Sequence, residues 1–360
     1  MSSLSIFGEN IPHVPNDPEL FKCRLTMLYG PSGSGKSSII LHILKLLQAV
    51  IPNGVVICPT NDMNKTFTGV FPDQMIHDNV NSDLLKQIFE RQKWGVTMYN
   101  KINNIELLQP IFAICSSTDD VEKTNKLTTF LNDSIFTLNN KNYDKEKRKN
   151  IRNELQDKHD TKLLNIMKRV IVNNKDKLLC DVSLTDDQYV IVKNISYNPN
   201  TILILDDCAS TAKDWKRFTE INKLFLEGRH YHTTTIISLQ AEAALPPLLR
   251  NNAHINIFTT KEIVTTYFKK ESTGVDKQMR NKIYAIAEEI FKDTKNNKKP
   301  NYKKLCWFST LIKTDYKIQY IIGIPFKFKF GSKSYWQFCE KVKKIEDNKQ
   351  TTNKINQLFG

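Results

Sequence analysis

RLTMLYGPSGSGKSSIILHILKLLQAV, residues 24–50, places a glycine-rich turn between a β-prone run and an apolar run with helical spacing. Within it, GPSGSGKS at Gly30 to Ser37 matches the phosphate-binding pattern GxxxxGK[ST] at every fixed position. Such a turn needs glycine because backbone N–H groups must face phosphate oxygens, and a Cβ would obstruct that conformation at positive φ. These residues therefore predict a strand, a phosphate-binding loop and a helix, in that order.

The motif also assigns side chains to a nucleotide. Lys36 would place a positive charge on the β- and γ-phosphates, and Ser37 would offer its hydroxyl to Mg²⁺. The first turn of the following helix adds the positive end of its dipole. An ordinary glycine-rich turn is the alternative interpretation. We expect ATP with Mg²⁺ to be held by Gly30, Pro31, Ser32, Gly33, Ser34, Gly35, Lys36, Ser37 and Ser38.

A second strand is expected close behind this helix. Residues 52–54 (PNG) break the helix, and the apolar run VVIC at residues 55–58 follows. A strand, a helix and a second strand predict a right-handed crossover and a parallel sheet. Residues 81–94 then have the spacing of an amphipathic helix that begins near Ser82.

Two adjacent acids end the next apolar run. TILIL, residues 201–205, is continuous like a strand buried on both faces of a parallel sheet, and Asp206 and Asp207 follow it. A P-loop requires an acid at the end of a neighbouring strand, so we assign Asp206 to the magnesium shell and Asp207 to the general base. A strand-end pair without chemistry is the alternative, and glutamate is more usual in the place of Asp207. The pair Asp186 and Asp187 has no preceding apolar run and competes weakly.

A polar residue closes another β-prone run, TTTIISL at residues 233–239, which follows a helical stretch around residues 215–226. A strand reached by a single crossover would lie between the P-loop strand and the acid strand, so Gln240 would face the γ-phosphate. An amide there can orient water or report phosphate loss, whereas a simple turn residue is the alternative. With a further strand at residues 255–258, the alternation predicts a doubly wound α/β core with its site along one edge of the sheet.

Two arginines precede predicted strands. Arg229 lies in GRHYHTTTIISLQ, at the expected end of a helix, and Arg250 lies in PPLLRNNAHINIF. An arginine near a helix C-terminus is commonly a surface residue paired with the helix dipole. In ring-shaped ATPases, however, an arginine from the neighbouring subunit stabilises the charge of the transition state. Arg229 is our first candidate for that role and Arg250 the second.

The composition changes between Trp94 and Pro199. Asn and Lys dominate, no glycine follows Gly95, and NNKNYDKEKRKNIRNELQDKHD is charged on every face. We interpret residues 95–199 as an insertion, helical in its middle third. A solvated spacer and an arm that contacts DNA or another partner are both compatible with this mixed charge.

The remaining composition bounds the class of protein. Beyond about Glu271 the chain is Lys-rich, with a helix expected over residues 278–291 and strand-like runs over residues 316–324. The net charge of +14 would attract a polyanion, although an AT-rich coding sequence could supply the same lysines. Seven dispersed cysteines without CxxC spacing argue against a disulfide framework and a zinc site. With no long apolar run and no signal-peptide pattern, we expect a soluble, unexported protein without a membrane span.

Taken together, these segments resemble the poxvirus-type genome-packaging ATPases of large double-stranded DNA viruses, a branch of the FtsK/HerA superfamily of P-loop ATPases. The resemblance covers most of residues 20–100 and 200–260. The Walker A portion is shared by all P-loop enzymes, whereas GRHYxxxxIIxLQ followed by LPxxLRxN is far more particular. It rests, in chain order, on GPSGSGKSS, VVICPT, FERQ, ILILDDC, GRHYHTTTIISLQ and LPPLLRNNAHINIF.

This resemblance implies a RecA-like P-loop NTPase core in which the acid strand lies next to the sensor strand. It also implies a homo-oligomeric ring, a pentamer or hexamer, with double-stranded DNA passing through a central channel. The family's functional positions match Lys36 and Ser37 for Walker A, Asp206 and Asp207 for Walker B, Gln240 for the sensor and Arg229 for the trans-acting arginine finger.

The prediction is thus an ATP-driven translocase that packages double-stranded DNA into preformed capsids, with ATP and Mg²⁺ as cofactors and a capsid or portal vertex protein as a further partner. It would act in the host cytoplasm or viral factory, or be associated with the virion. The insertion and the basic C-terminal region depart from the family pattern, so no DNA-contacting residue is assigned there. The expected organisation is residues 1–94 and 200–270 as the two halves of the core, 95–199 as the insertion and 271–360 as the C-terminal region.

Two other functions use the same motifs. A soluble P-loop nucleotide kinase would also need a P-loop and acids, but it requires a lid with paired arginines, and none is evident. A helicase or recombinase of the RecA class shares the sheet and the trans arginine. Basic composition and Gln240 favour a nucleic-acid motor over the kinase.

Overall fold

The computed structural model describes residues 3–6, 9–208, 215, 219–240, 245, 247–270, 273–292 and 302–359. The chain forms two compact units. The first unit consists of residues 1–92 and 200–360, and the second consists of residues 93–199.

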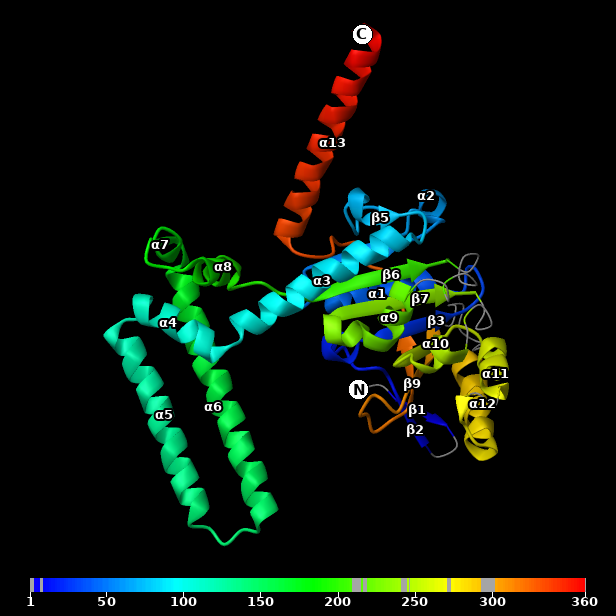
Figure 1. Cartoon of the computed structure of the whole chain (residues 1–360). Coiled ribbons are helices and arrows are strands. Elements are labelled where there is room, and N and C mark those ends of the chain that lie inside the picture. The colour runs from blue at the N-terminus through cyan, green and yellow to red at the C-terminus, as the bar shows by residue number, and fades with distance from the viewer. Residues whose placement is uncertain are drawn as a thin grey trace. The chain divides into compact units, whose positions relative to one another are not determined.

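An eight-stranded sheet lies at the centre of the first unit (Figure 1), in the order β10-β9-β8-β3-β7-β6-β4-β5. The six strands from β8 to β5 are parallel to their neighbours, whereas β9 and β10 are antiparallel. A separate two-stranded sheet pairs β1 with β2. The strands are β1 Ser3–Ile6, β2 Glu9–Pro12, β3 Leu25–Tyr29, β4 Asn53–Ile57, β5 Ile76–His77, β6 Thr201–Asp206, β7 Thr233–Leu239, β8 Ile255–Phe258, β9 Lys303–Phe308 and β10 Ile318–Ile322.

The strand order confirms the predicted fold class. The P-loop follows β3, the acid pair ends β6, and β7 lies between these two strands with hydrogen-bonded ladders to both. A strand between the P-loop strand and the acid strand is the arrangement expected for the RecA-like P-loop NTPase core. The predicted position of the strand that ends at Gln240 is therefore confirmed.

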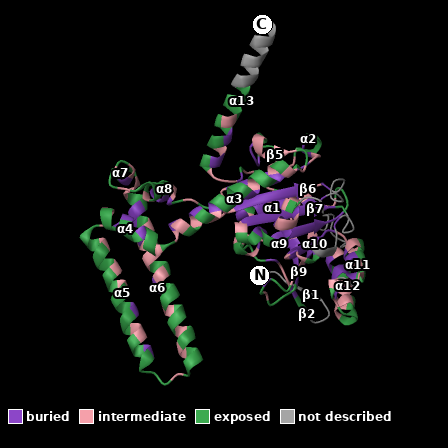
Figure 2. Cartoon of the chain, viewed as in Figure 1, coloured by how far each residue is buried: buried purple, intermediate pink, exposed green. Residues whose placement is uncertain are grey.

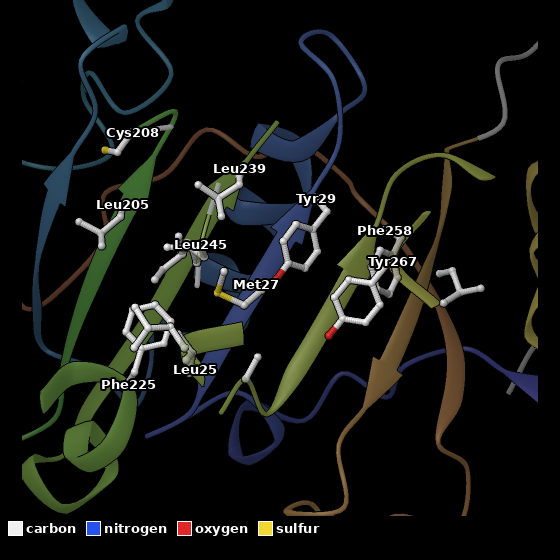
Figure 3. Packing of buried hydrophobic residues seen from close by; sticks show 14 of the residues in the cluster. Leu25, Met27, Tyr29, Leu205, Cys208, Phe225, Leu239, Leu245, Phe258 and Tyr267 are labelled. Atoms are coloured by element: carbon white, nitrogen blue, oxygen red, sulfur yellow. The ribbon is translucent and has the colours of Figure 1, made fainter. Parts of the chain in front are cut away.

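Both faces of the sheet are covered. Leu25, Met27 and Tyr29 of β3 point into one apolar layer (Figure 3), whereas Leu28 belongs to the opposite layer. Because successive residues of a strand point to opposite faces, each β3 side chain joins the layer that its position dictates. Helices α9, α11 and α12 cover the first face and α1 covers the second.

The helices of the first unit include one that the sequence predicts before β7. Of the helical stretch expected around residues 215–226, the described part includes α9 from Thr219 onward, and residues 216–218 lie outside the described residues. Trp215 is fully buried in the first apolar layer. The helices are α1 Lys36–Leu47, α2 Asn61–Asn64, α9 Thr219–Glu227, α10 Pro247–Asn251, α11 Lys261–Lys269, α12 Lys277–Phe291 and α13 Lys333–Phe359, with short 3₁₀ turns η1 Pro18–Leu20, η2 Asp73–Met75 and η4 Gly228–Tyr231.

The C-terminal region contributes directly to the central sheet. β9 pairs antiparallel with β8, opposing Leu305 to Phe258, and β10 pairs with β9. Leu305, Cys306 and Phe308 are fully buried, because apolar side chains on a strand added to a covered sheet join its two existing layers. The two strands therefore widen the sheet beyond its parallel part.

The second unit is largely helical, as expected for the insertion, and its helices extend beyond the middle third in which helix was predicted. Helix α3 also extends past its predicted end at Trp94. The physical reason for these helices is a separate apolar cluster in which residues such as Ile102, Ile111, Ile171 and Val192 bury their side chains. Figure 2 colours the buried residues of this unit purple. The helices are α3 Ser82–Ile102, which begins in the first unit, α4 Ile105–Cys115, α5 Thr118–Asn139, α6 Lys145–Asn173, α7 Lys175–Leu179 and α8 Asp186–Asn194.

Over the described ranges, none of the helices combines the length and the apolar character that crossing a membrane requires.

Candidate nucleotide-binding site

The glycine-rich turn joins β3 to α1 in the conformation that the motif predicts. Gly33 and Gly35 have φ values of 74° and 90°, in the left-handed region that favours glycine. The turn is tied to the sheet because the Gly30 N–H donates to the Leu239 carbonyl oxygen at 3.1 Å. Gly35 is the N-cap of α1, so the start of that helix points its free N–H groups at the turn.

Thr259, which follows β8, supports this turn from one side. A Cβ on Gly30 would lie 1.7 Å from Thr259 Oγ1, so only glycine permits this packing. Thr259 Oγ1 lies 3.1 Å from the Tyr29 carbonyl oxygen and 2.8 Å from Ser34 Oγ. Sequence reasoning missed Thr259, although a polar residue that closes an apolar run is the same signal that pointed to Gln240.

Lys36 is buried at the centre of the site, with 8% of its surface exposed. Its Nζ donates to the carbonyl oxygens of Gly30 at 2.7 Å and Pro31 at 3.0 Å. Burial lowers the pKa of Lys36, and attraction to Asp206 and Asp207 partly opposes that shift. The pairing of Tyr29 with Leu239 and of Asp206 with Ser238 sets the ends of β3, β7 and β6 at the same edge of the sheet.

The two acids stand at the end of β6 in different surroundings. Asp206 is 4% exposed, and burial raises the pKa of its carboxyl group. Asp207 is half-buried and has a φ of 56°, a left-handed conformation that aspartate tolerates better than most residues. Because the backbone turns at Asp207, the Asp206 carboxylate is buried whereas the Asp207 carboxylate is half-buried.

Gln240 belongs to the same constellation. Its Nε2 donates to Asp207 Oδ1 at 3.1 Å, which joins the end of β7 to the end of β6. The register places Asp206 opposite Ser238, so the two strand ends are level at this edge. The structure therefore gives Gln240 a direct contact with the second acid.

Lys304, near the start of β9, supplies a second cation that sequence reasoning missed. Its Nζ lies 3.5 Å from the Thr259 carbonyl oxygen, and its Cε would lie 3.5 Å from a Cβ on Gly35. Burial lowers the pKa of Lys304. Because β9 is antiparallel, its first residues meet the carboxyl ends of β8 and β3, and nothing in a Lys-rich segment marks this one lysine in advance.

The arginines lie elsewhere. Arg229, in η4, precedes β7, so the seven-residue strand separates it from Gln240 by about 20 Å within one chain. Arg229 is exposed, whereas Arg250 is 7% exposed and precedes β8. Within a single chain, neither arginine reaches the acid pair.

The remaining predicted site residues lie on the turn, at the start of α1 and in the second unit. Ser37 and Ser38 begin α1 and are half-buried, and Pro31 and Ser32 are exposed on the turn. The competing pair Asp186 and Asp187 begins α8 in the second unit, where Asp187 pairs with Lys101 at 3.0 Å. The structure thus brings together the P-loop, Asp206, Asp207 and Gln240 at one sheet edge.

This edge fits a magnesium nucleotide. The turn offers backbone N–H groups at positions where glycine leaves room, and no atom lies within 4 Å of a Cβ built on Gly33. A buried carboxyl group such as Asp206 ionises readily when a cation lies beside it. Fold and site together define a RecA-like P-loop core with a candidate site for a magnesium nucleotide.

Comparisons with known proteins relate the chain to viral proteins. It is 28% identical over 348 residues to the uncharacterized protein B354L of African swine fever virus, a match that covers 93% of this chain and 92% of the relative. It is 22% identical over 342 residues to the uncharacterized protein L437 of Acanthamoeba polyphaga mimivirus, covering 91% of this chain and 84% of the relative. No protein-family model matches the sequence.

Among solved structures, the chain is similar to the genome packaging NTPase B204 of Sulfolobus turreted icosahedral virus 2 in complex with ATP-gammaS. The sequence identity is 13%, the TM-score is 0.39, and the match covers 87% of this chain and all of B204. A likeness this distant leaves the fold assignment to the strand order and the P-loop of the chain itself.

Proposed function

We propose that this chain is a Mg-ATP-hydrolysing motor that moves double-stranded DNA, and that it packages a viral genome into preformed capsids as one subunit of a homo-oligomeric ring. The observation that carries the proposal is the meeting of Lys36, Asp207 and Gln240 at one sheet edge. A phosphate-binding turn opposite two acids and an amide is the set of groups that nucleotide hydrolysis requires.

Each residue has a defined task in this proposal. The Lys36 ammonium exchanges its two carbonyl partners for phosphate oxygens, and the Ser37 hydroxyl and the Asp206 carboxylate hold the metal shell. Asp207 accepts the proton of the attacking water, and the Gln240 amide fixes the orientation of that carboxylate. Bound Mg²⁺ neutralises charge that develops on the phosphates.

The proposed ring rests on the position of Arg229. An exposed arginine at the opposite end of β7 cannot serve its own site, but it can serve the site of a neighbouring copy. Arginines supplied in trans stabilise the transition-state charge in many nucleotide hydrolases. A pentamer or hexamer would supply one such arginine to every site.

Duplex DNA and packaging rest on other observations. A net charge of +14 favours a polyanionic partner, and the relatives that span most of the chain are encoded by viruses. The motor would work in the host cytoplasm or viral factory, or on the virion, against a capsid or portal vertex protein.

The test is the ATPase rate of the purified chain without nucleic acid, with single strands and with blunt duplex. Stimulation by duplex is the expected result, with Lys36→Ala as the inactive reference because it loses its phosphate contact. Stimulation by single strands alone, together with strand separation, would assign the chain to the helicases. Phosphate transfer to a nucleotide acceptor would identify a kinase.

A further inference from the structure

A helical hairpin projects within the second unit (Figure 1). Its helices α5 and α6 contain 22 and 29 residues, which correspond to about 33 Å and 44 Å of helix. The two helices contact each other, and Leu131, Leu138 and His159 are buried between or beside them. The hairpin is therefore a packed element that presents its connecting turn at one end.

The turn itself has a defined conformation. Asp144 caps α6 by accepting a hydrogen bond from the Lys147 N–H at 2.7 Å. The Arg148 guanidinium donates to the carbonyl oxygens of Lys141 at 3.1 Å and Tyr143 at 3.3 Å. Side chains at the start of α6 thus hold the turn in place.

Positive charge is concentrated at this end of the hairpin. Residues 141–152, which we name the basic turn, contain six basic and two acidic residues. The rest of the second unit contains eleven basic and twelve acidic residues. The mixed charge of the insertion is therefore segregated in space, a feature that its composition alone does not reveal.

The lysines of the basic turn differ in ion pairing from two lysines farther along the hairpin. Lys126 on α5 pairs with Glu122 and Lys158 on α6 pairs with Glu154, both at 2.6 Å. The lysines at positions 145, 147 and 149 are exposed, and no acidic side chain in the described part of the chain lies within 4.0 Å of their ammonium groups. Unpaired ammonium groups on an ordered turn are free to meet phosphates.

The basic turn offers cations rather than an open aromatic ring. Proteins that hold single strands stack bases on open aromatic rings. Within the turn, Tyr143 is half-buried, and the Lys147 ammonium lies 4.7 Å from the centre of its ring. The exposed rings of the hairpin, Phe130 and Phe136, belong to α5 and precede the turn. The lysines instead suit a dense, regular array of phosphates, which duplex DNA provides.

We propose that the basic turn, residues 141–152, binds the phosphate backbone of double-stranded DNA without regard to sequence. This inference rests on the proposed function, in which duplex DNA is the substrate of the motor. It adds a place of contact that lies outside the nucleotide site and outside the first unit.

The test uses the full chain and a labelled blunt duplex, with binding measured by fluorescence anisotropy over a range of salt concentrations. The turn variant carries Lys145→Gln, Lys147→Gln and Lys149→Gln. The matched control carries Lys123→Gln, Lys126→Gln and Lys158→Gln, which removes the same number of positive charges from α5 and α6 outside the basic turn. Glutamine keeps the helix propensity of lysine, and circular dichroism checks that both variants retain their helices.

The turn variant is expected to bind duplex on the order of tenfold more weakly. The slope of its log binding constant against log salt concentration should be shallower by about 2 to 3, because each lost phosphate contact removes about 0.9 from that slope. The control should bind like the wild type. Equal losses of duplex affinity in both variants, or no loss in either, would overturn the inference. Binding of polyglutamate as tightly as the duplex would also overturn it, because any polyanion would then suffice. If the wild type binds and is stimulated by duplex while the turn variant is unaffected, only this inference fails and the proposed motor stands.

Discussion

Lys36 and Asp206 show how burial prepares single residues for a nucleotide. Burial lowers the pKa of the lysine and raises the pKa of the aspartate, so each charged form is disfavoured by lost water. Phosphates and a metal ion supply the opposite charges that both side chains lack. The same reasoning extends to Lys304, whose pKa is also lowered by burial, on the other side of the turn.

Lys304→Met should weaken binding of ATP and ADP alike by about tenfold, which is about 1.5 kcal/mol for a charge-assisted contact. The loss should be equal because β8 and β9 lie on the side of β3 away from the acids that face the γ-phosphate. Titration with a fluorescent nucleotide measures both affinities. Lys303→Met is the control, since Lys303 lies over the Tyr320 ring at 5.9 Å. A loss of ATP affinity alone, or no loss, would contradict this role for Lys304.

At the scale of elements, the amino ends of the parallel strands form an edge with its own chemistry. The Leu25 N–H donates to His254 Nδ1 at 3.2 Å, where β3 and β8 begin. Burial, together with repulsion from Arg24 and Arg229, lowers the pKa of His254 from 6.5 to about 4. A protonated Nδ1 cannot accept this hydrogen bond, so the contact requires the neutral ring.

This shift predicts a loss of stability in acid. Because the folded pKa of His254 is depressed, the unfolded chain binds the proton first, so stability is complete above pH 6.5 and declines as pH falls towards 4. His254→Asn, which retains an acceptor that does not titrate, should flatten the decline in melting temperature over that interval. An unchanged pH profile in the variant would mean that other groups control acid stability.

Strand β7 gives the second prediction at this scale, because it holds Gln240 at one end and follows Arg229 at the other. Arg229→Ala should leave nucleotide affinity nearly unchanged but lower kcat by about a thousandfold, the range found for arginines that act in trans. Mixing Arg229→Ala with Asp207→Asn subunits should restore part of the activity, since some interfaces then carry both native residues. Without that rescue in a confirmed oligomer, Arg229 would be an ordinary surface residue.

For the whole molecule, the division into two units separates the nucleotide site from the hairpin. The P-loop, both acids and Gln240 all belong to the first unit. The second unit buries its own apolar cluster. Each unit therefore has the packing that a compact body requires.

Replacing residues 93–199 by a short glycine-serine linker should preserve nucleotide binding. Mg-ATP at a hundredfold its Kd stabilises a binding protein by about 2.7 kcal/mol, so the melting temperature should rise as it does in the full chain. Thermal denaturation with and without nucleotide measures this, and Lys36→Ala in the shortened chain should abolish the rise. An excised protein that folds but shows no rise would place part of the nucleotide site in the second unit.

The sequence by itself determined the P-loop, the buried strands and the acids that end them, because a glycine-rich turn and apolar runs closed by polar residues are local patterns. It also predicted that the strand before Gln240 lies between the P-loop strand and the acid strand, since a single crossover leaves few places for it. Tertiary structure alone decided that Thr259 and Lys304 lie against the turn. Each of these depends on residues distant in the chain, whose approach is set by the packing of whole elements and leaves no local pattern.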